Sequence, residues 1–341
     1  MVTRCPASCR RFDVRGILKG RVHYDAILIV SFGGPEGPDD VLPFLENVLR
    51  GRNVPRERML EVASHYQHFG GKSPINDSCR ALIAALRQQL ESEGPRLPVY
   101  WGNRNWHPLL PDTLRQMAAD GVRRAIAFAT SAYASYSSCR QYIENIEAAR
   151  VAAGPDAPAV DKLRPFFDHP LFIEATTDRV RAALGRRPGA RLVFTAHSIP
   201  VSMAATCDYE KQLRHTAGRV AEASGQGEWD LVWQSRSGPP GQPWLEPDIG
   251  SHLRELAGRG VRDVVAAPIG FLSDHLEVLY DLDVEAAQVA AGLGVHFLRA
   301  ETVGTHPAMV EMIRQLAAGR LAAPGPDACP DACCPGPARR G

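Results

Sequence analysis

The 341-residue chain lacks three features that would place it in other classes of protein. No apolar run approaches the roughly 20 residues that a membrane-spanning helix needs. The formal net charge is only +1, so the broad positive field of a nucleic-acid-binding or anionic-membrane protein is absent. The basic N-terminus contains no apolar signal-peptide core. These absences predict a cytoplasmic protein that has no stable membrane insertion and no nucleic-acid partner.

What the chain does contain is a regular alternation of apolar, strand-like runs with helical patterns. A hydrophobic content of 45% and a charged content of 23% are those of an ordinary globular protein long enough for two domains. Strands separated by helix-length segments form βαβ units and a parallel sheet. The expected strands are residues 26–32, 97–102, 125–131, 192–198, 231–235, 264–270 and 294–298.

The two halves of the chain resemble each other. Residues 121–149 are similar to 260–287, and residues 26–35 to 191–200, which places Phe32 opposite His197. We therefore expect an α/β protein with two similar doubly wound domains, parallel sheets and a site in the cleft between them. The predicted division, for a monomer, is an N-terminal extension (1–22), a first domain (23–158), a second domain (159–304), a helix packing back on the first domain (305–320) and a cysteine-rich tail (321–341).

Residues 266–285 carry an unusual row of acids. Asp274, Glu277, Asp281 and Glu285 are spaced so that one helix face would hold all four carboxylates, beside His275. The simplest interpretation is a solvated acidic face. However, the row begins where a predicted strand ends, which is where open α/β sheets keep their sites. This position favours a role in handling a cation.

Three further segments lie where a predicted strand ends or a predicted helix begins. His197 ends a strand, so its imidazole could accept a proton or hold a metal, or could be purely structural. Ser73 lies in a glycine turn that either starts a helix or binds an anion, and the turn matches no nucleotide fingerprint. Trp244, in the loop 234–250, is either a loop anchor or a wall for a flat aromatic ligand.

Five segments in order resemble motifs of the ferrochelatase family: SFGGPEGPDDV, HYQHFGGKSPIN, FTAHSIP, VWQSRSGPPGQPWLEPDI and PIGFLSDHLEVLYDLD. The resemblance covers residues 25 to about 318. It implies a lyase-class metal chelatase that inserts Fe(II) into a porphyrin without a nucleotide. It also implies that His197 and Glu277 face each other across the macrocycle as catalytic residues and iron contacts, and that Ser73 and Tyr142 contact the porphyrin. Asp281 and Glu285 lie deeper along the acidic helix, and this position predicts a path for iron or protons.

One position departs from part of this family. Some bacterial members carry a tyrosine that reaches the metal in the first strand-end motif, where this chain has Phe32. A phenylalanine can line the porphyrin site, as Trp244 could, but it cannot bind iron. The axial contact would then come from His197, Glu277 or water.

The expected substrate is coproporphyrin III, giving coproheme in haem biosynthesis, with a downstream coproheme-handling enzyme as a further partner. One alternative is a protoporphyrin IX ferrochelatase. Another, of a different class, is a non-catalytic haem or iron carrier, or a redox sensor, on the same fold. The pairing of His197 with a row of carboxylates argues against a carrier, which needs no proton acceptor.

The chain has eight cysteines, and three of them, Cys329, Cys333 and Cys334, lie in the last thirteen residues. Three thiolates need a fourth to hold an iron–sulfur cluster. Some ferrochelatases bind a two-iron, two-sulfur cluster with three C-terminal cysteines and one internal cysteine, and the resemblance implies the same here. Cys139 is the expected fourth ligand and Cys207 the alternative. Incidental thiols in a disordered tail are the simpler interpretation.

Overall fold

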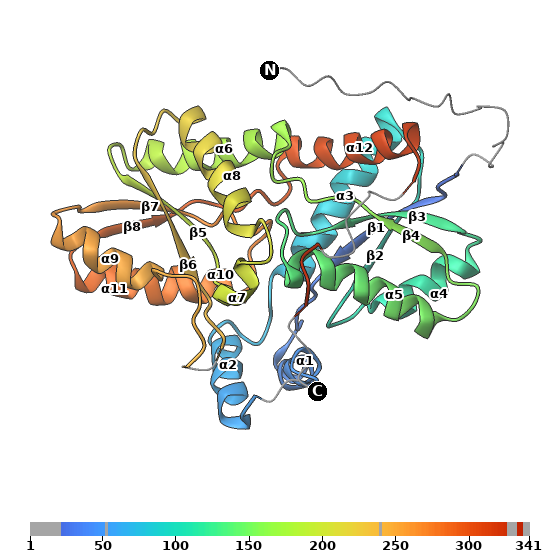
Figure 1. Ribbon diagram of the computed structural model, residues 1–341, viewed down its shortest axis with the longest axis horizontal. Coiled ribbons are helices and arrows are strands. Elements are labelled where there is room, and N and C mark those ends of the chain that lie inside the picture. Colours follow the sequence, from blue (N-terminus) through green and yellow to red (C-terminus); the bar gives the residue numbers. More distant parts are fainter. Residues whose placement is uncertain (1–21, 52–53, 239–240, 326–332, 337–341) are drawn as a thin grey trace, which may run out of the picture.

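The computed structural model describes residues 22–51, 54–238, 241–325 and 333–336, and in these two lobes lie side by side, each built on a four-stranded parallel sheet (Figure 1). The first sheet has the order β2-β1-β3-β4 and the second the order β6-β5-β7-β8. The strands are β1 (Ala26–Ser31), β2 (Val99–Asn103), β3 (Arg124–Ala129), β4 (Ala159–Lys162), β5 (Arg191–His197), β6 (Trp229–Gln234), β7 (Asp263–Ala267) and β8 (His296–Arg299). The predicted α/β class with two parallel sheets is confirmed.

Helices cover both faces of each sheet. The helices of the first half of the chain, including α1 and α2, which project away from the sheet, are η1 (Pro38–Asp40), α1 (Val41–Val48), α2 (Arg56–His68), α3 (Ile75–Glu93), α4 (Leu110–Ala119), η2 (Tyr136–Arg140) and α5 (Gln141–Ala153). Those of the second are α6 (Pro170–Arg186), α7 (Val201–Ala204), α8 (Tyr209–Ala223), α9 (Ile249–Gly258), α10 (Leu276–Val278), η3 (Leu279–Ala286) and α11 (Ala287–Gly292), followed by α12 (Pro307–Ala322). Within the described ranges no helix has both the length and the apolar composition needed to cross a membrane.

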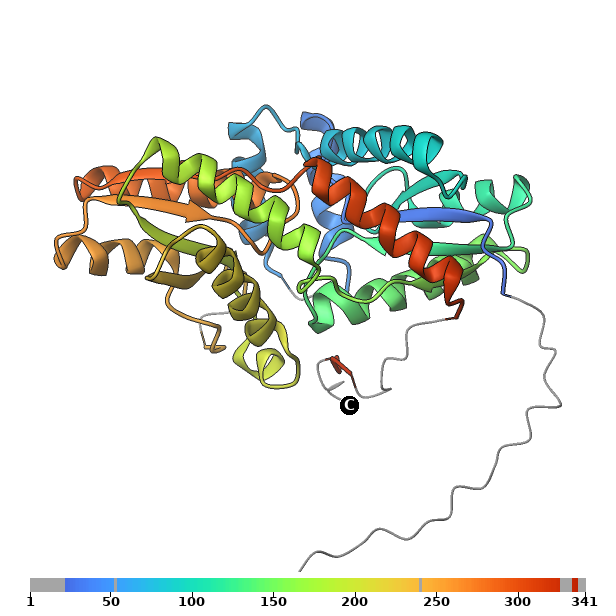
Figure 2. The same ribbon diagram turned by 90° about the horizontal axis from the view of Figure 1, so that it is seen from above.

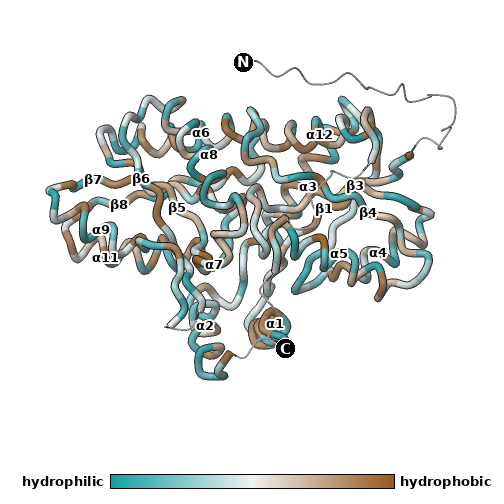
Figure 3. Tube along the Cα trace, in the orientation of Figure 1, coloured by the Kyte–Doolittle hydropathy of each residue, from teal (hydrophilic) through white to brown (hydrophobic). Residues whose placement is uncertain are grey.

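The central strands are apolar because both of their faces are covered. All six residues of β1 are buried. Ile27 and Ile29 belong to the main core cluster on one face, whereas Leu28 and Val30 pack with residues of α4 and α5 on the other. Such two-sided burial produces a continuous apolar run instead of an alternating one. The hydropathy colouring shows these strands as brown segments in the middle of each lobe (Figure 3).

The repeat seen in the sequence appears as the same strand order in both lobes. β1 and β5 take equivalent places, each between its lobe's second and third strands in chain order. Phe32 directly follows β1, and His197 is the last residue of β5. The C-terminal strand ends are therefore where both residues lie, as the internal similarity predicts.

The predicted boundary at residue 158 falls one strand too early. β4 begins at Ala159, yet it pairs with β3 and completes the first sheet. The strand has only four residues, and its neighbours include prolines and a glycine, so the sequence pattern there is that of a linker. The chain crosses to the second lobe only after Lys162.

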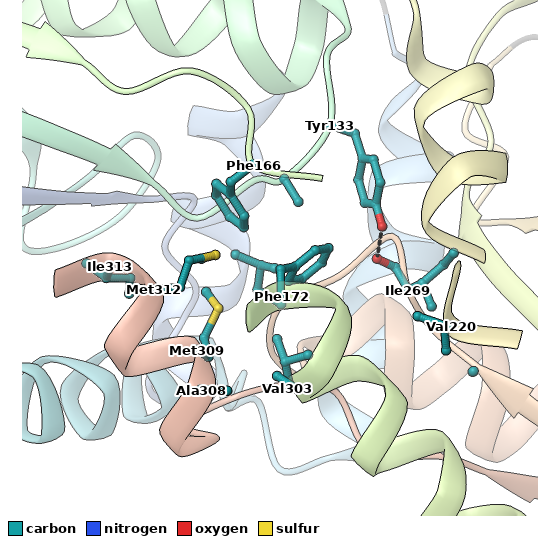
Figure 4. Close-up of a cluster of buried hydrophobic side chains, with 14 of the residues drawn as sticks. Tyr133, Phe166, Phe172, Val220, Ile269, Val303, Ala308, Met309, Met312 and Ile313 are labelled. Carbon is teal, nitrogen blue, oxygen red and sulfur yellow. Dashed lines mark hydrogen bonds between the residues drawn. The ribbon is translucent and has the colours of Figure 1, made fainter. Parts of the chain in front are cut away.

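The lobes share one apolar core (Figure 4). The hydroxyl of Tyr133, after β3, donates a 3.0 Å hydrogen bond to the carbonyl oxygen of Ile269, after β7. Nearby, the ring of Phe166 meets that of Phe172, at the start of α6, edge to face, with ring centroids 5.4 Å apart. α12 packs against α3 of the first lobe and equally against α6 of the second, so it bridges the two. Figure 2 shows α12 running alongside both.

Candidate active site

His197 and Glu277 meet beyond the strand ends of the second sheet. The Nε2 atom of His197 lies 3.7 Å from Oε2 of Glu277. The other ring nitrogen, Nδ1, is 2.5 Å from the carbonyl oxygen of Ser198. With Nδ1 held as the donor by that carbonyl, Nε2 is the nitrogen that can accept a proton. The imidazole is 30% exposed and the carboxylate 52% exposed, so both remain accessible to a ligand.

The acidic segment is not one α-helix. A single turn of α-helix, α10, passes into the π-helix η3 and then into α11. Asp274 precedes this segment and binds Arg299 and Thr302, so it does not belong to the row of acids, contrary to the sequence-based expectation. Because a π-helix is wound more widely than an α-helix, acids four residues apart in it still face the same side. Glu277, Asp281 and Glu285 remain as the acidic row.

Asp281 is the acid whose proton affinity is changed most. Burial raises its pKa to about 7, and the carboxylates of Glu277 and Glu285 add to this rise. A hydrogen bond from the hydroxyl of Ser235 acts in the opposite direction. A carboxyl group with a pKa near neutrality can take up and release protons at ordinary pH.

Two residues of this site were not expected from the sequence. Gln234 ends β6, accepts a hydrogen bond of 2.8 Å from Thr195, and places its amide nitrogen 3.5 Å from Asp281. Ser235 follows with a φ angle of 61°, a conformation that non-glycine residues rarely adopt. The signal was available, since both residues end the predicted strand 231–235 and begin the loop 234–250, at the edge where His197 lies.

On the first lobe, Phe32, Arg104 and Tyr142 form a stacked group. The guanidinium carbon of Arg104 lies 5.6 Å from the centre of the Phe32 ring and 4.6 Å from that of Tyr142. Phe32 is 37% exposed, whereas Tyr142 is only 4% exposed. Phe32 therefore presents an apolar surface at the strand end, and Tyr142 lies beneath Arg104.

Ser73 and Trp244 lie on different lobes, Ser73 before α3 and Trp244 in the loop paired with Pro200. Ser73 is 2% exposed, and its backbone N–H donates to the carbonyl oxygen of Pro35 at 2.9 Å, so it belongs to the floor beneath the Phe32 loop. Trp244 forms a bridge with Pro200, three residues beyond His197. The loop that carries Trp244 is therefore held beside the strand end where His197 lies.

At the margin of the site, α1 and α2 contact α10 and η3 of the second lobe. The ring of His65 on α2 stacks on that of Tyr280 in η3, with centroids 3.7 Å apart. Burial lowers the pKa of His65, while Glu285 acts to raise it, which places this end of the acidic row near α2. Leu276 joins the apolar cluster of α1 and α2. The helices α1 and α2 project between the lobes on the underside in Figure 1.

The described cysteines of the tail lie at the junction of the lobes. The sulfur atoms of Cys333 and Cys334 are 3.7 Å apart. Burial raises the pKa of Cys334, and the thiols of Cys333, Cys139 and Cys207 raise it further, so all four are neighbours. In Figures 1 and 2 this short red segment lies beside η2 and α7. Cys329 and residues 1–21 lie outside the described residues.

Within the described ranges, no three His, Cys, Asp or Glu side chains surround one point as ligands of a single metal ion. The pair formed by His197 and Glu277, with Asp281 behind it, is instead suited to moving protons beside a bound cation. An imidazole and two carboxyl groups can accept a proton, pass it on and offer negative charge to a metal.

Comparison with solved structures gives the class of fold. SirB from Bacillus subtilis with Fe3+ superposes with a TM-score of 0.56 at 13% identity, covering 88% of this chain and 96% of that one. The sirohydrochlorin chelatase SirB from Bacillus subtilis subspecies spizizenii, in complex with cobalt, gives a TM-score of 0.51 at 12% identity, with the same coverage. The fold is that of the chelatases.

The chain belongs to the ferrochelatase family, whose model matches residues 24–321. The ferrochelatase of Rhodopirellula baltica is 55% identical over 327 residues, which are 91% of this chain and 93% of that one. The coproporphyrin III ferrochelatase of Nocardia farcinica is 56% identical over 305 residues, or 86% and 87% of the two chains. The family expected from the motifs is confirmed.

Proposed function

We propose that this protein is a ferrochelatase that inserts Fe(II) into coproporphyrin III to give coproheme. The observation that carries the proposal is the contact of 3.7 Å between His197 and Glu277 at the strand ends of a chelatase fold. The coproporphyrin III ferrochelatases of Nocardia farcinica and Mycolicibacterium vanbaalenii, 56% and 53% identical to this chain, support the choice of porphyrin.

The reaction exchanges two pyrrole protons for one ferrous ion, and the iron keeps its oxidation state. Nε2 of His197 accepts a pyrrole proton, because its Nδ1 is engaged by the Ser198 carbonyl. The neighbouring carboxylate of Glu277 stabilises the imidazolium and relays the proton away. A second cycle of the same two groups removes the second proton. His197 and Glu277 are thus the proposed catalytic residues.

The remaining acids would bring in the iron or lead out the protons. Asp281 lies behind Glu277 with a pKa near 7, and Glu285 lies one further step along the row. A hydrated cation moving along this row would meet carboxylate oxygens at each step. The iron's ligands from this chain would then be His197 and Glu277, with Asp281 and Glu285 as its path.

The porphyrin would lie between the two lobes. Phe32 presents an apolar surface to one face of the macrocycle, and its ring cannot ligate iron from that side. Trp244 would line the other margin through the loop paired with Pro200. Ser73 and Tyr142 are buried, so they would support the porphyrin floor mainly through the Phe32 loop and Arg104.

A direct experiment is turnover of the purified protein with Fe(II) and either coproporphyrin III or protoporphyrin IX. We expect the higher kcat/KM with coproporphyrin III. A preference for protoporphyrin IX would favour the alternative ferrochelatase, and binding without turnover of either would favour a haem or iron carrier. The proposal also includes a monomer in the cytoplasm that passes coproheme to a downstream enzyme.

We also propose a two-iron, two-sulfur cluster at the tail. Two thiolates on one tetrahedral metal with bonds of about 2.3 Å lie about 3.8 Å apart, and the Cys333–Cys334 distance of 3.7 Å fits that spacing. Each iron of such a cluster takes two protein thiols. Cys139 and Cys329 would complete the set, with Cys207 as the alternative to Cys139. When bound, the cluster supplies a cross-link that fastens the tail to the body of the protein.

The cluster is tested by anaerobic purification, visible absorbance and sulfide analysis. We expect coloured protein, and we expect Cys139→Ser to lose both colour and thermal stability while Cys207→Ser keeps them. The reverse result would identify Cys207 as the ligand. A colourless, fully active wild type without sulfide would exclude the cluster.

A further inference from the structure

Arg299, the last residue of β8, binds two carboxylates, one before α10 and one within η3. Its Nη1 and Nη2 atoms donate to the two oxygens of Asp274 at 3.0 and 3.1 Å. Its Nε and Nη2 atoms donate to the two oxygens of Asp283 at 2.7 and 2.9 Å. Four of the five N–H donors of the guanidinium are thereby used in two bidentate pairs.

The two anchored acids lie on either side of Glu277 in the sequence. Asp274 lies two residues before the start of α10, and Asp283 lies in the middle of η3. Glu277 and Asp281 fall between them in the chain. Asp274 is fixed further by a 3.0 Å hydrogen bond from Thr302. The side chain of Arg299 is only 14% exposed, so solvent screens these pairs little.

Such anchoring matters because Glu277 has little support of its own. Its carboxylate is 52% exposed, and the ion pair described for it is the 3.7 Å contact with His197. The position of the carboxylate therefore depends on the backbone that carries it. That backbone enters a π-helix, whose rare winding needs support from elsewhere in the structure.

Arg299 connects this backbone to the sheet that also positions His197. Arg299 pairs with Ala266 on β7, and β7 pairs with β5, the strand that ends at His197. The guanidinium therefore ties the π-helical segment to the same rigid frame as the imidazole.

Building on the proposed iron insertion, we infer that Arg299 is a positioning residue for the reaction, which holds Glu277 in register with His197 through Asp274 and Asp283. A displacement of about 1 Å of a reacting group can reduce a rate by about 100-fold. Loss of Arg299 should therefore reduce kcat while leaving the porphyrin walls, and hence KM for porphyrin, in place.

The test compares Arg299→Gln, Arg299→Lys and Asp283→Asn with Arg314→Gln. Arg314 is a matched control, since it is 19% exposed and also binds two acids, Glu311 and Glu93, but lies on α12. We expect Arg299→Gln to lower kcat by about tenfold or more with KM changed less than about twofold. Arg299→Lys should recover part of the loss, because the positive charge is kept. Recovery should be incomplete, because an ammonium group cannot bind both carboxylates in the bidentate way of a guanidinium.

Asp283→Asn keeps the test decisive if Arg299→Gln does not fold, because Asp283 is 38% exposed and its loss should be tolerated. It should lower kcat by about three- to tenfold in protein whose melting temperature stays near that of wild type. An unchanged kcat for Asp283→Asn, or a loss in Arg299→Gln no greater than in Arg314→Gln, would overturn the inference. An inactive wild type would instead refute the proposed function.

Discussion

Gly270 and Ala196 touch where the ends of β7 and β5 come together. A Cβ atom at Gly270 would lie 2.6 Å from the Cβ atom of Ala196 and 2.7 Å from its Cα atom. The N–H of Gly270 also donates to the carbonyl oxygen of Thr195 at 3.1 Å. This close approach fixes the backbone directly before His197.

We therefore predict that Gly270→Ala destabilises the protein by about 1–3 kcal/mol, because the added methyl group must push two backbones apart. The same displacement should lower kcat, since His197 is the next residue after Ala196. Urea unfolding and steady-state kinetics measure the two effects. Gly218→Ala, whose Cβ would meet only the Trp229 ring at 3.7 Å, is the control and should change kcat little.

His197→Ala should lower kcat for iron insertion by at least about 100-fold, the contribution typical of a general base. Porphyrin binding should persist, because most of its affinity comes from burying the faces of the macrocycle. Fluorescence titration measures the binding and single-turnover absorbance the insertion. Near-normal turnover at saturating iron would show that another group accepts the protons.

Neutralising the acidic row should have graded effects. Glu277→Gln should reduce the chemical step most, because Glu277 is the acid in contact with His197. Asp281→Asn and Glu285→Gln should mainly raise KM for Fe(II), since they lie further along the proposed path. Equal losses of kcat in all three variants, with KM for iron unchanged, would contradict this order.

Stability in acid should depend on Asp230, at the start of the second sheet. Burial raises the pKa of Asp230, but hydrogen bonds from Arg191 at 2.7 and 3.1 Å and a contact with His252 outweigh burial and hold it below 3.8. A carboxyl group whose pKa is lower in the folded than in the unfolded state stabilises the folded protein at pH values above its unfolded-state pKa. This stabilisation is lost as the pH falls through the folded-state pKa.

Asp230→Asn should therefore cost about 1 kcal/mol at pH 7, discounted for partial exposure. The difference from wild type should shrink below about pH 4. Urea unfolding at pH 7, 4 and 3 measures this change. A difference that stays constant over that range would show that the carboxylate charge is not what stabilises the sheet.

Much of the fold could be predicted because its strands are buried on both faces. β1 and β5 appear in the sequence as continuous apolar runs, and the repeat between the halves indicates their equivalent places. β4 was missed since two of its four residues are charged, so it carries no comparable apolar run. This segment is a strand because it pairs with β3, and that pairing depends on the tertiary fold.

The strand-end residues of the candidate site could be predicted from the sequence, but the winding of the helix that carries the acids could not. His197 and Glu277 follow from position in the chain. The π-helical winding of residues 279–286 does not, because an i, i+4 spacing of acids suits an α-helix equally well. The same limit explains Asp274, whose partner Arg299 lies 25 residues away in sequence.

The shared core has a consequence for how a ligand enters. Tyr133 is hydrogen-bonded to Ile269 across the lobes, and α12 is packed against both. A hinge motion that separated the two lobes would expose this shared apolar core to water. We therefore expect a flat substrate to enter and leave where α2 meets η3, because the stacked rings of His65 and Tyr280 can separate there while the shared core stays intact.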